Sequence, residues 1–144
     1  MLTRSKPKPG PTTTLFDSTN YLSLRPSTNV ALYLCGRYAA PNTPATAKRF
    51  KTITWICVCG QHPEANALDI ETGDAIPSDV LTWVPAHVKH YGDKGRARLY
   101  SNLSTWPQVK LYVSKVSPVE RSTVRYWIAD PTGREHVEIG RAHV

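Results

Sequence analysis

The sequence lacks several features that would assign it to a protein class directly. No stretch approaches the roughly 20 consecutive apolar residues that a membrane-spanning helix needs. The N-terminus also lacks the apolar run of a secretory signal. We therefore expect a product that starts in the cytoplasm and does not enter a membrane. With 144 residues, 40% of them hydrophobic, the chain can form one globular core.

Cysteine is scarce and odd in number. A disulfide framework is not expected from Cys35, Cys57 and Cys59 in a chain without a secretory signal. Cys57 and Cys59 could ligate a metal together with His62, but the paired CxxC spacing of structural zinc sites is missing. We favour small, buried strand residues, and we predict no metal and no cofactor.

Acidic residues are few, and the formal net charge is +7. Four of the basic residues, Arg4, Lys6, Lys8 and Arg141, lie near the two ends, so residues 11–138 are only mildly basic. A mild positive charge favours approach to an anionic bacterial envelope. No recognition-helix or zinc-finger pattern is present, and we expect no nucleic-acid partner.

The two ends differ from the rest of the chain. Residues 1–13 are rich in Pro, Lys and Thr and indicate a disordered basic leader. Residues 139–144 match the translation of a common sequencing adapter, and Glu138 also fits the adapter bases that precede them. We interpret 139–144 as adapter read-through rather than an ordinary polar tail. Residues 14–138 then form the domain.

Segments typical of strands and helices alternate along that domain. Strands are predicted over 15–17, 30–35, 52–59, 65–71, 96–101 and 123–130. Helices are predicted over 44–50, 77–91 and 104–113, the last capped by Ser104. This order predicts an α/β protein with parallel strands. Because only six strands are predicted, we expect a TIM-type (β/α)8 barrel that is truncated after about six strands.

The clearest candidate site is Asp69 and Glu71, at the end of the fourth predicted strand. Side chains at i and i+2 of a strand point the same way, and about 6.6 Å separates the two backbone positions. This is near the carboxyl separation that glycosidases use for acid and base work. Mutual repulsion should leave one carboxyl protonated, and we take Glu71 as the candidate acid. A solvated acidic pair at a strand end is the alternative.

Two further carboxylates end predicted strands. Asp17 ends the first strand and Asp130 the sixth, and the active face of a β/α barrel lies at the C-terminal ends of its strands. Convergence at this face would give a catalytic role to Asp17 and a substrate-binding role to Asp130. The alternative for each is a turn residue, in an Asx-turn or at the first position of a β-turn.

Aromatic residues near the same strand ends are candidates for stacking on sugar rings. They are Tyr38, Tyr100, Trp106 and Trp127. Core packing is the alternative role, and we favour it for Trp55 and Trp83. No Gly-x-Ser-x-Gly elbow or other activated nucleophile motif is present, which disfavours a serine or cysteine hydrolase.

The ordered segments LFDS, ALDIETGDAIP, LYSNLSTWP and YWIADPTG, spanning residues 15–136, carry a family resemblance. Together they resemble the lysozyme-like glycoside hydrolase family twenty-five and its relatives in actinobacterial phage lysins. The family's motif residues carry over to Asp17, to Asp69 with Glu71, and to Trp127, and the glutamate of its DxE motif is the proton donor. A carboxylate that the family has near its final strand finds no counterpart in this sequence, and Asp130 cannot be equated with it.

The resemblance implies a metal-free β/α barrel that hydrolyses the bond between N-acetylmuramic acid and N-acetylglucosamine. We therefore predict a peptidoglycan hydrolase, a muramidase-like endolysin, that is made in a host cytoplasm and acts on the bacterial cell wall as a monomer. In the hypothesised mechanism Glu71 protonates the leaving oxygen and Asp69 orients the substrate's own acetamido nucleophile. A non-catalytic wall-binding barrel is the alternative, and a nucleic-acid-binding protein ranks below both.

Overall fold

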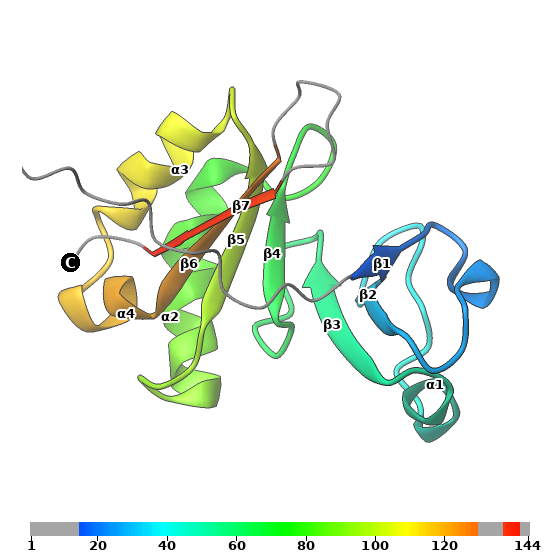
Figure 1. Ribbon diagram of the computed structural model, residues 1–144. Helices are drawn as coiled ribbons and strands as arrows, with labels where there is room; N and C mark the ends of the chain where they lie inside the picture. Colours follow the sequence, from blue (N-terminus) through cyan, green and yellow to red (C-terminus); the bar gives the residue numbers. More distant parts are fainter. Residues whose placement is uncertain (1–14, 130–136, 142–144) are drawn as a thin grey trace, which may run out of the picture.

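The structure is a computed structural model that describes residues 15–129 and 137–141 (Figure 1). Its strands are β1 (Phe16–Asp17), β2 (Asn29–Tyr33), β3 (Thr52–Cys57), β4 (Ala67–Ile70), β5 (Ala97–Asn102), β6 (Val124–Ala129) and β7 (Val137–Arg141). Its helices are η1 (Tyr21–Ser23), α1 (Pro44–Arg49), η2 (Pro77–Asp79), α2 (Val80–Tyr91), α3 (Trp106–Val113) and α4 (Pro118–Thr123). In the described part of the chain, no helix is both long enough and apolar enough to span a bilayer.

The seven strands form one sheet in the order in which they occur along the chain. Strands β1 to β6 are parallel neighbours, whereas β7 pairs with β6 in the antiparallel direction. The sheet curls as a half-barrel, with β1 and β2 turned away from the plane of β5 and β6 (Figure 1). The predicted α/β class and all six predicted strands are confirmed.

Alternation along the strands divides the sheet into two faces. On the outer face Leu68, Leu99 and Val124 are fully or almost fully buried against Trp83 and Val109 of the helices. Helices α2, α3 and α4 cover this face behind β4 to β6 (Figure 1). Burial of a large aliphatic side chain contributes about 1.5–3 kcal/mol, so this layer supplies much of the stability. The inner, concave face is free to form a cavity.

Helix α2 also holds the connection between β3 and β4, a connection that contains no helix among its described residues. The Trp83 indole donates to the carbonyl of residue 62 at 3.0 Å, and a 2.8 Å hydrogen bond joins the His87 ring to the carbonyl of residue 63. The Tyr91 hydroxyl donates to the carbonyl of residue 64. Because residues 83, 87 and 91 are four apart, they lie on one helix face and bind three consecutive carbonyls. These three bonds position the segment that leads into β4.

The structure differs from the sequence predictions at three places. Helix α4 is present in the structure but was not predicted, although Ser117 and Glu120 form a capping box at its start. Ser104 does not cap α3, because Thr105 occupies the N-cap and the side chain of Asn102 accepts from the Thr105 amide. Strand β7, which overlaps the segment interpreted as adapter read-through, is not among the six predicted strands, and its backbone pairs with β6.

Gly36, which follows β2, occupies a position where any side chain would meet both backbone strain and an atomic overlap. Its φ is +85°, and a Cβ atom there would lie 2.6 Å from Cγ2 of Val58. The loops after β2 and β3 therefore touch at this glycine. Gly73 has a similar φ of +89°, but a Cβ atom there would have no neighbour within 4 Å.

These two glycines make a matched pair of substitutions. We expect Gly73→Ala to lower the free energy of unfolding by about 1–2 kcal/mol, which is the cost of the left-handed conformation alone. Gly36→Ala should cost about 1–3 kcal/mol more, because the new methyl group overlaps Val58. Urea unfolding of both variants measures the difference, and equal destabilisation would show that the two loops do not meet as described.

Candidate functional site

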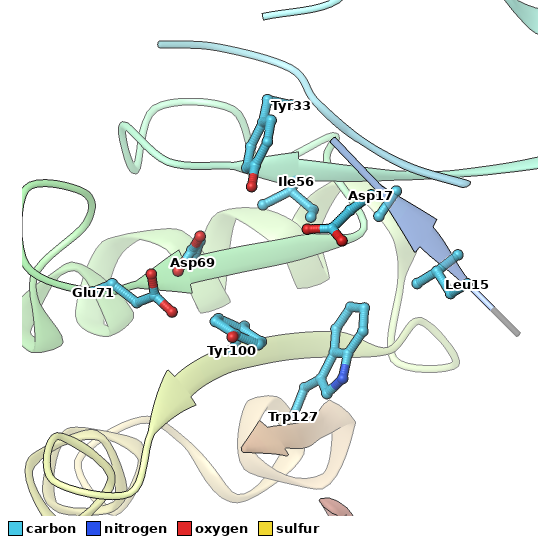
Figure 2. Close-up of a pocket in the computed structure, with 9 residues that line it drawn as sticks. Leu15, Asp17, Tyr33, Ile56, Asp69, Glu71, Tyr100 and Trp127 are labelled. Atoms are coloured by element: carbon cyan, nitrogen blue, oxygen red, sulfur yellow. The ribbon is translucent and has the colours of Figure 1, made fainter. Parts of the chain in front are cut away.

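A cavity of about 370 Å³ lies on the concave face of the sheet (Figure 2). It has the size of a small-molecule site. Five of the residues singled out from the sequence line it: Asp17, Asp69, Glu71, Tyr100 and Trp127. The remaining lining residues are Leu15, Ala31, Tyr33 and Ile56.

Strand register explains why these side chains meet. Asp69 pairs with Tyr100, and Tyr100 pairs in turn with Trp127, so the three lie in one row across β4, β5 and β6. Side chains in such a row project from the same face of the sheet. The Tyr100 and Trp127 rings meet edge to face at 5.7 Å. Tyr33 points toward them from the opposite wall (Figure 2).

Asp69 is the most buried carboxyl of the cavity. Its side chain is only 6% exposed, and Oδ1 has no hydrogen-bond partner within the described chain. Burial, followed by the negative charges of Glu71, Asp74 and Asp17, raises the pKa of Asp69 to about 8. Near neutral pH this carboxyl therefore holds a proton.

Glu71 is half-buried beside it. Burial raises the pKa of Glu71, and the hydrogen bond from the Tyr100 hydroxyl opposes this rise. Burial, together with the charges of Glu71 and Asp69, in turn raises the pKa of Tyr100 to about 12, so Tyr100 remains a donor. The spacing argument from the sequence takes Glu71 as the protonated member of the pair. The pKa shifts instead favour Asp69, because it is the more deeply buried of the two.

Asp74 joins the two carboxyls, although its sequence context predicts only a turn residue. One carboxylate oxygen from each of Asp69, Glu71 and Asp74 lies within 4.8 Å of the others. Burial raises the pKa of Asp74 too. Three oxygen ligands at this spacing could hold a hard cation such as Mg²⁺ or Ca²⁺ once they are ionised. The turn sequence Thr72-Gly73-Asp74 contains no signal for this convergence.

A second cavity of about 480 Å³ adjoins the first. Both are lined by Tyr33, Asp69 and Glu71, so the carboxyl pair lies where the two cavities meet. The predicted Tyr38 lines the second cavity rather than the first, and its side chain is 47% exposed. We refer to the two adjoining cavities together as the trough. Tyr33 is not among the residues predicted for the site, because it lies in an apolar run typical of a strand buried on both faces.

The remaining predicted residues lie elsewhere. Trp106 begins α3 on the outer face, where it packs against the core and meets the Tyr126 ring at 6.1 Å, so it is not part of the trough. Its position follows from the helix, which turns the side chain toward β6 and away from the strand ends. Asp130 lies outside the described residues. Trp83 is fully buried and Trp55 is half-buried against the core, as expected for packing residues.

No family model, no curated protein and no solved structure matches the chain. Evidence for a function therefore comes from the trough itself.

The raised pKa of Asp69 predicts a specific dependence of stability on pH. The folded state keeps a proton on this carboxyl between its ordinary pKa of 3.8 and about 8, whereas the unfolded state releases it. Relative to Asp69→Asn, the wild-type free energy of unfolding should fall by up to ~1.4 kcal/mol for each pH unit across that window. Denaturant unfolding at several pH values checks this slope, and parallel curves for the two proteins would contradict the burial of an ionisable Asp69.

Proposed function

We propose that this trough binds a carbohydrate chain and hydrolyses a glycosidic bond by carboxylate acid catalysis. One observation carries the proposal: two electrostatically coupled carboxyls, Asp69 and Glu71, lie at the centre of a trough walled by aromatic rings. Glycoside hydrolysis needs one protonated and one ionised carboxyl at the same bond. Aromatic faces beside them suit the apolar faces of sugar rings.

The coupling between the two carboxyls supports a shared catalytic proton. Burial and, after it, the charge of Glu71 raise the pKa of Asp69, so protonating Glu71 lowers the pKa of Asp69 and eases its ionisation. We assign proton donation to Glu71, because its more exposed side chain can reach a leaving oxygen and because the glutamate of the DxE motif is the proton donor in the family that the sequence resembles. Ionised Asp69 would then stabilise the positive charge that develops on the sugar, or orient the acetamido group of the substrate.

The spacing of the carboxyls bears on the stereochemical course. Their nearest oxygens are at most 4.8 Å apart. Inverting glycosidases separate the two groups by about 6.5–9.5 Å to admit a water molecule, whereas retaining enzymes hold them about 5–5.5 Å apart. The separation of the two carboxyl groups is larger than this nearest-oxygen distance, so the spacing is compatible with retention, through either a covalent intermediate or the acetamido group of the substrate.

The resemblance to family twenty-five suggests the substrate class. A peptidoglycan glycan strand is a linear polymer of N-acetylated sugars, and the trough presents rings on both sides of the carboxyl pair: Tyr100 and Trp127 in the first cavity, Tyr38 in the second. We therefore propose a muramidase-like activity on bacterial cell walls.

A turbidity assay on purified bacterial walls tests this function. Wild-type protein should clear the suspension, and Glu71→Gln should reduce the rate by about 10²–10⁴-fold because a proton donor is lost. Glu64→Gln is the matched control: this carboxylate is remote from the trough and pairs with His62 at 2.8 Å. Its rate should equal that of the wild type.

The same assay distinguishes a wall-binding module from an enzyme. If wild-type protein sediments with walls without clearing them, and Glu71→Gln sediments equally, a non-catalytic carbohydrate-binding barrel replaces the hydrolase. Circular dichroism of each variant establishes that it is folded. Loss of structure in Glu71→Gln would leave Asp69→Asn as the second test of the carboxyl pair.

We further propose that the half-barrel belongs to a complete TIM-type (β/α)8 barrel. The strictly sequential order of six parallel strands and the curl of the sheet support this. Two more β/α units would then follow β6 and displace β7 from its edge. Sequencing the source gene through codon 138 tests the proposal, which predicts about two further strand–helix repeats. An authentic reading frame that stops after Val144 would contradict it.

A further inference from the structure

The three cysteines of the chain meet at one point, although they come from two different strand ends. Cys35 follows β2, Cys57 ends β3, and Cys59 lies two residues beyond it. Their sulfur atoms are 2.7 Å apart for Cys35 and Cys59, and 3.8 Å apart for the two pairs that include Cys57. Cys57 is buried, Cys35 half-buried and Cys59 exposed. The expectation of three small buried residues therefore holds only for Cys57.

The backbone holds this arrangement in place. Parallel pairing sets Tyr33 opposite Ile56, which brings the ends of β2 and β3 together. The loops beyond them touch where Gly36 meets Val58. The sulfur positions therefore follow from strand register and a glycine contact, and do not depend on long flexible side chains.

Backbone amides point at the sulfur atoms. The amides of Val58 and Cys59 each donate to Sγ of Cys35 at 3.3 Å, and the amide of His62 donates to Cys57. Such bonds stabilise the thiolate form, which is the form that binds metals.

We propose that Cys35, Cys57 and Cys59 form a three-sulfur binding site for a thiophilic divalent ion such as Zn²⁺. Tetrahedral coordination with Zn–S bonds of about 2.3 Å places ligand sulfurs about 3.8 Å apart. Two of the three sulfur pairs already have this separation. The third pair must open by roughly 1 Å to reach it, and the exposed Cys59 side chain can rotate to do so.

The position of the site indicates an open coordination sphere. Cys35 and Cys59 line the second cavity, which is also lined by Glu71 and Asp74. Three protein ligands and one position that faces a cavity is the pattern of a metal site accessible to small ligands. Loading the site converts three thiols to thiolates and releases three protons to solvent. The site stands independently of the proposed hydrolase activity.

Cobalt substitution tests the site directly. The full-length chain, reduced with a phosphine and freed of metal, is titrated with Co²⁺ under anaerobic conditions. We expect one ion per chain and sulfur-to-cobalt charge-transfer absorption in the near ultraviolet. Cys59→Ser and Cys35→Ser should each weaken Co²⁺ binding by at least about tenfold and lower the absorption per bound ion. Cys59 is exposed, so its variant keeps the core intact.

Asp74→Asn is the matched control, because it removes a ligand from the neighbouring carboxylate cluster and leaves the three sulfurs in place. It should bind Co²⁺ with unchanged charge-transfer absorption. Cobalt binding without that absorption, or binding lost in Asp74→Asn and kept in both serine variants, would assign the metal to the carboxylates and overturn the proposal. A reduced protein that binds no Co²⁺, and forms a Cys35–Cys59 disulfide when exposed to glutathione disulfide, would overturn it in favour of a redox pair.

Discussion

In-register parallel pairing of β4, β5 and β6 produces both the core and the trough. Leu68 pairs with Leu99 in one row of the sheet, and Asp69 pairs with Tyr100 and through it with Trp127 in the next. The first row faces the helices and the second faces the concave side. A shift of one residue in the strand register would exchange the two rows, placing a carboxyl under the helices and leucines in the trough. Burial of the apolar row thereby enforces the position of the polar one, and the three hydrogen bonds from α2 hold the segment that leads into β4.

Much of this arrangement is predictable from local sequence. Each strand is a short run of β-branched, aromatic or aliphatic residues that stops at a turn signal, and each of the six lies where such a run occurs. The spacing of Asp69 and Glu71 alone predicts that both face the same cavity, because strand side chains repeat every two residues. Asp17, Tyr100 and Trp127 join them because parallel strands bring like ends to one side of the sheet.

Other features depend on contacts between distant residues and have no local signal. The meeting of Cys35 with Cys57 and Cys59 depends on the register of β2 against β3, and Asp74 reaches the carboxyl pair only through the fold of a turn. Trp106 lies on the outer face, away from the trough, because proximity to a strand end in sequence does not determine which side of the sheet a helix occupies. Helix α4 is a different case, since its capping box is present in the sequence. Which carboxyl keeps the proton depends on burial, which spacing does not reveal.

The three residues shared by the two cavities have a consequence for any polymer that reacts at this site. Tyr33, Asp69 and Glu71 line both cavities and therefore stand where the two meet. A chain that occupied both cavities would cross the carboxyls with an internal bond. Scission would therefore divide a long strand into large pieces and would not release single units from a terminus.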